Sequence, residues 1–180
     1  MSEVTEVFRQ LLQQAQLQAQ AQQQQWLSYA DPAEPSPCQY GEVNAEQQVA
    51  WWPHYLEKLQ DFSGLEHGLE LEIHPSVQAF YGFCFGGGLA VSHPRGPAEL
   101  LMVWHQGDFS RLQQNIIAHM LMKRRLKQRE TVFFAVTDDE DMLLSVLNQT
   151  GEVFLERAGC EVTEKLADSL GEFLRQLSLP

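Results

Sequence analysis

The sequence predicts a single α/β (α+β) domain, in which a mixed or antiparallel sheet is flanked by helices and a long helix stands at the N-terminal end. Three observations predict this class. The chain has 180 residues, 44% hydrophobic and 20% charged, which is the size and composition of one ordinary globular domain. Helical apolar patterns open and close the chain, and short apolar runs between turn residues fill the middle. No internal repeat interrupts residues 1–180, so one domain is expected.

The N-terminal helix is predicted over residues 1–29. No glycine or proline occurs from Glu3 to Tyr29, and apolar residues recur at helical spacing in the first half (Val4, Phe8, Leu11, Leu12 and Ala15). The second half is rich in glutamine and alanine, which are good helix formers. The next segment, 30–40, contains three prolines and is predicted to be a loop, because proline removes a backbone donor. The α/β core is then expected over residues 41–180.

The first half of this core gives weaker patterns. An aromatic strand is predicted around Val49–Trp52, ended by a proline. Ser63 and Glu66 have the spacing of a capping box, which predicts a short helix to about residue 69. Residues 70–85 mix a proline with many aromatic side chains, and their periodicity predicts no element. Glycines at 86–88 predict a turn, which leads into two paired strands at 89–92 and 100–104.

The second half of the core gives the clearest patterns. Asp108 is predicted to cap a helix that ends near Arg125 and shows an apolar stripe (Phe109, Leu112, Ile116, Ile117, Met120 and Leu121). The apolar run at 132–136 predicts a central strand. An acidic turn follows, and then a hairpin is predicted from strands at 143–148 and 153–156. Leucine and phenylalanine at helical spacing over 164–177 predict a closing amphipathic helix on the sheet.

The charge distribution favours a basic protein partner. The formal net charge is −12, from 24 acidic and 12 basic residues, and five of the basic residues lie between Lys123 and Arg129. This balance opposes binding to nucleic acid or to a bare anionic membrane. The basic run either offsets the negative end of a helix or contacts anionic lipid, and the sequence leaves both interpretations open.

Two groups of acidic residues are candidates for contact with such a partner. One contains Asp61, Glu66, Glu70 and Glu72, and the other is the run 138–141. Most acidic runs are simply solvated faces. If the two groups converge in the fold, their summed potential would attract and orient a basic segment.

The sequence contains no motif for catalysis or metal binding. Its six histidines form no HExxH or HxH pattern, and the cysteines Cys38, Cys84 and Cys160 form no CxxC pair. His119 is expected to be a partly buried histidine with a hydrogen-bond partner. The glycines at 86–88 match no phosphate-binding motif, and no GxSxG elbow occurs. The protein is therefore predicted not to be an enzyme and to need no metal or other cofactor.

No segment has the pattern of a secretory signal or a membrane span. The first ten residues are acidic and polar, whereas a signal needs a basic start and an apolar run. No run approaches the roughly 20 apolar residues that span a bilayer. The sequence therefore predicts a cytosolic protein whose association with a membrane would be peripheral.

Several segments together resemble the Syd family. They are Pro35–Cys38, Ile73–Tyr81 (IHPSVQAFY), Asp108–His119 (DFSRLQQNIIAH) with the basic residues after it, and Ser145–Val153 (SVLNQTGEV). They occur in the family's order and cover most of the chain. Thr150 departs from the family's pattern, where a serine is usual. The glutamine-rich stretch from 13 to 25 also departs from it, so nothing functional is transferred to that stretch.

The resemblance implies a regulatory protein, loosely attached to the cytoplasmic side of the bacterial inner membrane through its partner, the SecY translocation channel. It implies an acidic concave surface that receives basic cytoplasmic loops of SecY. Binding would restrain the translocase or scavenge channel that is free or wrongly assembled. No nucleic acid and no small-molecule substrate is expected. The acidic positions that match the family's pattern are the predicted partner-binding residues: Glu66, Glu70, Asp108, Asp138, Asp139 and Glu140.

Two other functions remain open at this point. An immunity-type or adaptor domain that binds a soluble basic protein would use the same acidic surface. A small hydrolase is the more distant alternative. A basic partner recovered without membranes would favour the first, and turnover lost on changing one histidine or cysteine would favour the second.

Overall fold

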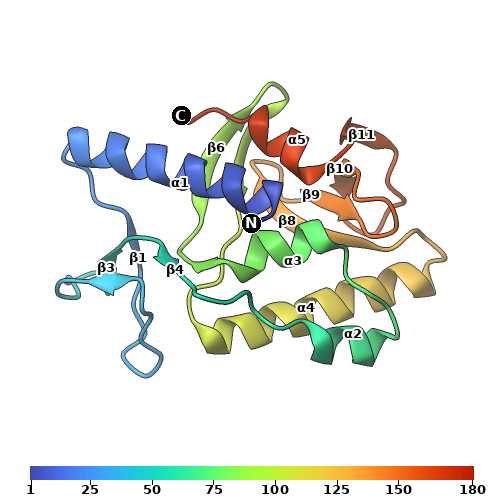
Figure 1. Cartoon of the computed structure of the whole chain (residues 1–180), viewed down its shortest axis with the longest axis horizontal. Helices are drawn as coiled ribbons and strands as arrows, with labels where there is room; N and C mark the ends of the chain where they lie inside the picture. Colours follow the sequence, from blue (N-terminus) through green and yellow to red (C-terminus); the bar gives the residue numbers. More distant parts are fainter.

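Six strands form an antiparallel meander at the centre of the computed structural model, which describes residues 1–180 (Figure 1). Every strand pairs with its neighbour in sequence, so the spatial order is β11-β10-β9-β8-β7-β6. The meander is the antiparallel sheet that the sequence predicts. Its strands are β6 Leu89–His93, β7 Gly96–Leu100, β8 Thr131–Thr137, β9 Met142–Leu147, β10 Val153–Arg157 and β11 Glu164–Ala167.

Helices cover both faces of the meander. They are α1 Glu3–Ala21, α2 Ser63–Leu69, α3 Pro75–Gly82, α4 Gln106–Arg125 and α5 Leu170–Arg175. α4 packs on β8 and on α2, whereas α1 packs on α3 and α5 (Figure 1). One continuous hydrophobic core joins these helices to the sheet, which confirms the single domain with flanking helices. None of the helices is both long and apolar enough to cross a bilayer.

The strand β8 is central because helices lie on both of its faces. Phe134 points toward α3 and α5, where its ring centroid lies 5.6 Å from that of Phe80 and 5.5 Å from that of Phe173. Phe133 points toward α4, where its ring meets His119 at 5.5 Å. A strand between two helix layers buries both sides, which explains its uninterrupted apolar run. The prediction of a central strand is confirmed.

The N-terminal helix is shorter than predicted. α1 ends at Ala21, and Leu27–Tyr29 forms strand β1 where the last helical turns were expected. Gln23 adopts a left-handed backbone conformation with φ of 54°, which turns the chain out of the helix. β1 pairs with β3 (Gln48–Trp51), and β3 also pairs with β2 (Gln39–Tyr40), in a separate three-stranded sheet. This tertiary pairing outweighs the helix propensity of the glutamines.

The predicted apolar face of α1 is confirmed. All five of its residues are buried (Val4, Phe8, Leu11, Leu12 and Ala15). The ring of Phe8 stacks on Phe80 of α3 at 4.7 Å between centroids and meets Phe83 edge-on at 5.4 Å. The first turn of α1 lies beside α5, where Glu3 forms an ion pair with Arg175. α1 therefore docks along the length of the core instead of extending into solvent.

Residues 70–85, for which the sequence predicts no element, contain α3 and the short strand β5 (Cys84–Phe85). His74 caps α3, because its Nδ1 accepts a hydrogen bond from the N–H of Ser76 at 3.2 Å. α3 is buried on nearly every side (Val77, Ala79, Phe80 and Tyr81), so its sequence shows no amphipathic stripe. β5 pairs with β4 (His54–Tyr55) in a separate two-stranded antiparallel sheet.

Two predicted elements lie elsewhere. The strand expected at 100–104 is β7, which begins at Gly96, because His93 and Gly96 pair across a two-residue turn and Gly96 supplies its φ of 136°. The helix expected over 164–177 is wrong in its first part, which forms β11 and pairs with β10. The helix α5 starts only after Ser169, whose hydroxyl accepts a hydrogen bond from the N–H of Glu172.

The other predicted elements are confirmed. β3 lies within one residue of the predicted strand, and α2 covers the predicted helix. β9 and β10 form the predicted hairpin, and the acidic residues at 138–141 form the predicted turn between β8 and β9. α4 ends at Arg125 as expected.

Candidate partner-binding surface

Three of the candidate acidic residues lie at the end of α2 and in the loop that follows it. α2 ends where Glu70 adopts a left-handed backbone conformation with φ of 52°. Glu70 and Glu72 are exposed, and Glu66 is half-buried. None of the three forms an ion pair. Their negative charge is therefore not neutralised within the chain.

Glu66 braces the loop after α2 and does not cap the helix. Its Oε1 accepts hydrogen bonds from the N–H of Ile73 and from the side-chain amide of Gln78, each at 2.9 Å. The predicted capping box is therefore wrong, because Ser63 donates to the carboxylate of Asp61 and α2 has no side-chain cap at its start. The second oxygen of Glu66, Oε2, has no hydrogen-bond partner in the chain.

Asn148 fastens this loop to the turn between β9 and β10. Its Nδ2 donates to the carbonyl oxygen of Glu72, and its Oδ1 accepts from the N–H of His74, both at 2.9 Å. Gly151 in the same turn has φ of 83°, and a Cβ at this position would lie 2.5 Å from Cε1 of His74. Glycine therefore permits the turn to pack directly against the histidine ring.

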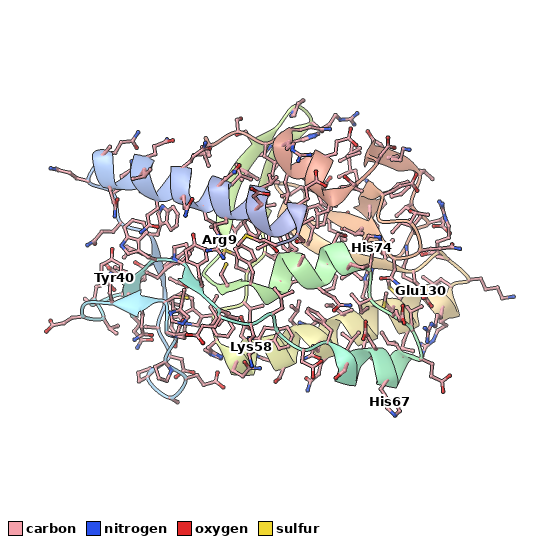
Figure 2. The ribbon with its side chains drawn as sticks, in the orientation of Figure 1. Arg9, Tyr40, Lys58, His67, His74 and Glu130 are labelled. Carbon is pink, nitrogen blue, oxygen red and sulfur yellow. The ribbon has the colours of Figure 1, made fainter.

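These residues enclose a polar hollow of about 450 Å³, which we call the α2 hollow. Burial lowers the pKa of His74, so its ring is neutral at physiological pH and adds no positive charge. Two carboxylates and no lysine or arginine line this concave surface, which suits a basic side chain. His74, one of the lining residues, is labelled in Figure 2. The lining residues are Glu66, Glu72, Ile73, His74, Pro75, Gln78, Asn148 and Gln149.

The second acidic group lies in the turn between β8 and β9. Asp138, Asp139 and Glu140 are exposed there. A hollow of about 300 Å³ beside this turn is lined by Asp138 and Asp139, but also by Arg95 and Arg157. Its charges are mixed, so it attracts a basic segment less selectively than the α2 hollow does.

The two acidic groups do not converge. The end of α2 lies beside the start of β8, because Arg124 donates to the carbonyl oxygen of Leu69 at 2.9 Å and pairs with Glu130 just before that strand. His74 and Glu130 are neighbours in Figure 2. The turn with Asp138 lies beyond the other end of β8, a strand of 7 residues, which places it roughly 20 Å away. The convergence that the sequence leaves open therefore does not occur, and the two acidic groups form separate surfaces.

Comparison with known proteins identifies the family. The chain matches the family model described as Syd protein (SUKH-2) over residues 2–179. It belongs to the Syd family. The chain is 43% identical to Protein Syd of Pseudoalteromonas atlantica over 145 residues, which cover 79% of this chain and 78% of the relative. It is 42% identical to Protein Syd of Colwellia psychrerythraea (80% and 76% covered) and of Alteromonas mediterranea (80% of both). The resemblance seen in the sequence motifs is confirmed.

Asp108, the remaining position that matches the Syd pattern, has a local structural role. The predicted cap of α4 is wrong by three residues, because His105 caps the helix and its Nδ1 accepts from the N–H of Asp108 at 3.0 Å. The Asp108 carboxylate accepts from the N–H of Trp104 at 2.8 Å and pairs with Arg111 at 3.7 Å. Roughly 24 Å of helix, 16 residues from 108 to 124 at about 1.5 Å each, separates it from Arg124, which contacts the end of α2.

Sequence analysis missed the residues that complete the α2 hollow of this Syd-family chain. Glu72 was assigned to an acidic group but not to the partner-binding set. His74, Gln78 and Asn148 lie within the two Syd-like segments that contain IHPSVQAFY and SVLNQTGEV. These segments were a usable signal, but the hydrogen bonds of Asn148 join positions 74 and 76 residues apart, which no local pattern reveals.

The basic run from Lys123 to Arg129, which begins in the last turn of α4, offers less positive surface than its sequence indicates. Lys123 is fully buried, and its Nζ donates to Oε1 of Glu156 and to the carbonyl oxygen of Cys160, both at 2.7 Å. Only part of the run is therefore available to offset the end of the helix or to contact lipid. Two of its arginines are paired as well, Arg124 with Glu130 and Arg129 with Glu161.

His119 lies in the same buried polar network, between α4 and the sheet. Its Nε2 lies 2.9 Å from Oγ1 of Thr131, and that hydroxyl lies 2.9 Å from Oε2 of Glu156. Burial lowers the pKa of His119, so the ring is neutral at physiological pH. The prediction of a partly buried histidine with a hydrogen-bond partner is confirmed.

Two of the three cysteines are poor nucleophiles in the folded chain. Cys38 and Cys84 are buried, and burial raises the pKa of both thiols, whereas Cys160 is exposed. We expect an aromatic disulfide reagent near neutral pH to label one thiol per folded chain quickly and all three after unfolding in urea. The Cys160→Ser variant is expected to lose the fast phase. A second fast thiol in the folded chain would contradict the burial described here.

Proposed function

We propose that this protein is a non-catalytic regulator that binds the basic cytoplasmic loops of the SecY translocation channel. Membership of the Syd family supports the choice of partner. The observation that carries the proposal is the α2 hollow, in which Glu66 and Glu72 line a concave polar surface without a lysine or arginine. A lysine or arginine from a SecY loop would enter this hollow, and the exposed Glu70 beside it would steer the approach.

The chain's own hydrogen bonds determine which atoms would receive the cation. Oε1 of Glu66 is already occupied by Ile73 and Gln78, whereas Oε2 is free. Asn148 holds the backbone of Glu72 through its carbonyl oxygen, and the carboxylate of Glu72 forms no hydrogen bond or ion pair within the chain. Charge-assisted hydrogen bonds from an ammonium or guanidinium group to these oxygens would hold the loop.

The turn with Asp138, Asp139 and Glu140 is proposed as a second contact, for another basic segment of the channel. Once this protein occupies its basic loops, free or wrongly assembled SecY would not enter a working translocase. The protein would thereby restrain the translocase or scavenge the channel. The protein would lie on the cytoplasmic side of the bacterial inner membrane, attached through SecY. The proposed role requires no cofactor and no small-molecule substrate.

Binding to SecY in nanodiscs, measured across a salt series, tests this proposal. The variant Glu70→Lys/Glu72→Lys is expected to bind at least about tenfold more weakly at low salt, because like charges that face each other at an interface cost more than about 1.4 kcal/mol. Wild-type binding is expected to weaken as salt rises, since the Debye length falls from about 30 Å at 0.01 M to about 8 Å at 0.15 M. Asp138→Lys/Asp139→Lys is expected to have a smaller effect.

The matched control is Glu42→Lys/Glu46→Lys, which makes the same change of charge at two exposed residues outside both acidic groups. It is expected to bind nearly as the wild type does. Equal losses in both double variants would mean that only net charge matters and that the α2 hollow has no special role. Binding that ignores salt and charge reversal would keep the partner and reject the electrostatic mechanism. An absence of binding would favour a soluble basic partner, as for an immunity-type or adaptor domain.

A further inference from the structure

The outer side of the last turns of α4 exposes apolar side chains where a helix that faces solvent normally carries polar ones. The buried side of this half of the helix contains Ile116, Met120 and Lys123. On the opposite side, Leu121 is 49% exposed and Leu126, the C-cap residue, is 47% exposed. Positions three and four residues apart share one side of a helix, so these leucines belong to one surface, which we call the α4 tip. Its residues are Ala118, Leu121, Met122, Arg125, Leu126 and Lys127.

The α4 tip carries two cations that have no partner within the chain. Arg125 and Lys127 are exposed, and none of the ion pairs or side-chain hydrogen bonds includes either of them. The other three cations of the basic run each pair with a glutamate. The glutamates that contact the run are thus neutralised by its other cations, and the α4 tip keeps a net positive charge.

The end of α4 is satisfied without these two cations. The carbonyl oxygens of residues 122–124 accept hydrogen bonds from the N–H groups of residues 126–128, at 2.9 to 3.0 Å. Lys127 adopts a left-handed backbone conformation with φ of 56°, which turns the chain out of the helix. The side chains of Arg125 and Lys127 are not needed to occupy the last carbonyl groups. They are therefore available to another molecule.

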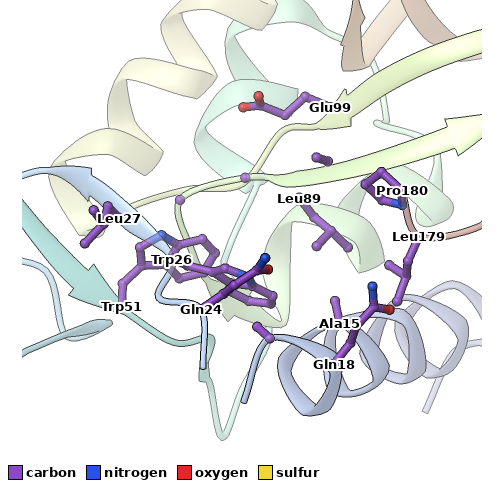
Figure 3. Close-up of a pocket in the computed structure, with 14 residues that line it drawn as sticks. Ala15, Gln18, Gln24, Trp26, Leu27, Trp51, Leu89, Glu99, Leu179 and Pro180 are labelled. Carbon is purple, nitrogen blue, oxygen red and sulfur yellow. The ribbon is translucent and has the colours of Figure 1, made fainter. Parts of the chain in front are cut away.

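The other exposed leucines of the chain have different surroundings. Leu17 lies among glutamines of α1, and Leu59 stands in an exposed segment that contains Glu57 and Asp61. Leu27 lines a hollow of about 360 Å³ together with two tryptophans (Figure 3). No lysine or arginine lines that hollow, so neither its shape nor its charge selects an anionic ligand.

The segment that forms the α4 tip is also the least acidic part of the chain. Residues 109–129 contain no aspartate or glutamate, although the chain has 24 acidic residues in 180. The same segment contains six of the 12 basic residues. Exposed leucines and unpaired cations therefore occur together, without an acidic residue between them, at the α4 tip.

This combination matches the chemistry of an anionic lipid surface. In a segment that lies at a membrane interface, leucines enter the boundary between headgroups and acyl chains, and lysine and arginine pair with the phosphate groups. The cores of protein interfaces are instead rich in aromatic residues and poor in lysine. The α4 tip has no aromatic side chain, and it lines none of the three hollows described above.

We propose that the α4 tip binds the surface of an anionic phospholipid bilayer. Leu121 and Leu126 insert between the headgroups, and Arg125 and Lys127 pair with lipid phosphate groups. At 0.15 M salt the Debye length is about 8 Å, so acidic residues farther away than this oppose the contact only weakly. The basic run thus has a direct role at the membrane, which the sequence leaves open.

The α4 tip and the α2 hollow would then lie at the same membrane surface. Arg124 donates to the carbonyl oxygen of Leu69, so the end of α2 lies beside the end of α4 (Figure 1). The unpaired Glu70 follows Leu69 on this side of α4, and the α4 tip occupies another side of the helix. With the tip on lipid, the α2 hollow would face the region where cytoplasmic loops of a channel leave the bilayer. This last consequence rests on the proposed function, whereas the lipid contact does not.

The test is cosedimentation of the purified full chain with sucrose-loaded vesicles at 0.15 M salt, without SecY. One set of vesicles contains phosphatidylcholine alone, and the other also contains phosphatidylglycerol. We expect the wild type to bind the anionic vesicles much more strongly. Arg125→Gln/Lys127→Gln is expected to lower the partition coefficient about 25-fold, since each cation near an anionic surface contributes about fivefold. Leu121→Ser/Leu126→Ser is expected to lower it at least about tenfold, because less apolar surface leaves water.

Two control variants make the same changes elsewhere on the surface. Lys58→Gln/Lys165→Gln removes two exposed cations, and Leu17→Ser/Leu59→Ser removes two exposed leucines. Both are expected to bind nearly as the wild type does, and circular dichroism in urea verifies that every variant is folded.

Three results would each overturn the lipid contact. They are equal losses in the test and control variants, equal binding to the two kinds of vesicle, and no binding of the wild type to anionic vesicles at millimolar lipid. The last result would favour an acidic protein as the partner of the α4 tip. Because these vesicles contain no SecY, a failure here leaves the SecY measurement unaffected, and a failure to bind SecY leaves this result unaffected.

Discussion

Replacing Lys123 with methionine is expected to cost about 3–5 kcal/mol of the free energy of unfolding, because it leaves one partner of a buried ion pair uncompensated. Lys123 and Glu156 are both 0% exposed, and their charged atoms are 2.7 Å apart. Methionine retains most of the volume of the lysine side chain but lacks the ammonium group. The Glu156 carboxylate would therefore keep only the hydroxyl of Thr131 as a hydrogen-bond donor. Urea unfolding followed by circular dichroism measures the loss.

Two variants separate this effect from a general effect of charge. Arg125→Met, two residues along the same helix, removes an exposed cation and is expected to change stability by less than about 0.5 kcal/mol. The double variant Lys123→Met/Glu156→Leu removes both charges and is expected to recover most of the loss, since a buried pair replaced by apolar residues is often neutral. If Lys123→Met were as stable as Arg125→Met, the buried ion pair would not exist in solution.

Replacing Phe8 with alanine is expected to cost about 3–5 kcal/mol, the usual cost of removing a buried aromatic ring. Phe8 is 1% exposed and packs between Phe80 and Phe83. Its loss would leave a cavity between α1 and α3. Because α1 also packs on α5, the same change is expected to speed hydrogen exchange of the α1 amides more than that of the β8 amides.

Leu17→Ala is the matched control in the same helix, since Leu17 is 66% exposed and its truncation is expected to cost less than about 0.5 kcal/mol. Similar losses for Phe8→Ala and Leu17→Ala, measured by urea unfolding, would mean that α1 does not dock through the face described here. The comparison holds helix propensity nearly constant, because both substitutions introduce alanine into the interior of one helix.

The elements that sequence analysis predicted correctly are those whose burial follows a simple local pattern. β8 is apolar on both faces, and the strands of the β9–β10 hairpin are short apolar runs on either side of a glycine-containing turn. Lys123 is a residue whose burial such local patterns do not predict. It stands one helical turn after the buried Met120, at a core position of α4, but its charge places it with the basic run when only the sequence is read. Its partner Glu156 is 33 residues away, so only the tertiary structure reveals the ion pair.

The candidate site was harder to predict than the fold, for a related reason. The spacing of Ser63 and Glu66 fits a capping box, and yet Glu66 turns toward Ile73 because the loop after α2 returns past it. The sequence does not show whether the two acidic groups converge, because this depends on the direction of β8. In the structure, β8 separates Asp138 from Glu70. The sequence correctly shows an excess of negative charge, but only the tertiary structure shows which acidic residues share a concave surface.

The packing of α1 has a consequence for synthesis of the chain. α1 leaves the ribosome well before α5, the helix on which its first turn packs. The meander between them pairs only neighbouring strands, so it can assemble progressively as each hairpin appears. During that time the apolar face of α1 has no complete docking surface. The nascent chain therefore presents an unprotected amphipathic helix until α5 has been synthesised, and this interval is when a holding chaperone would protect it from aggregation.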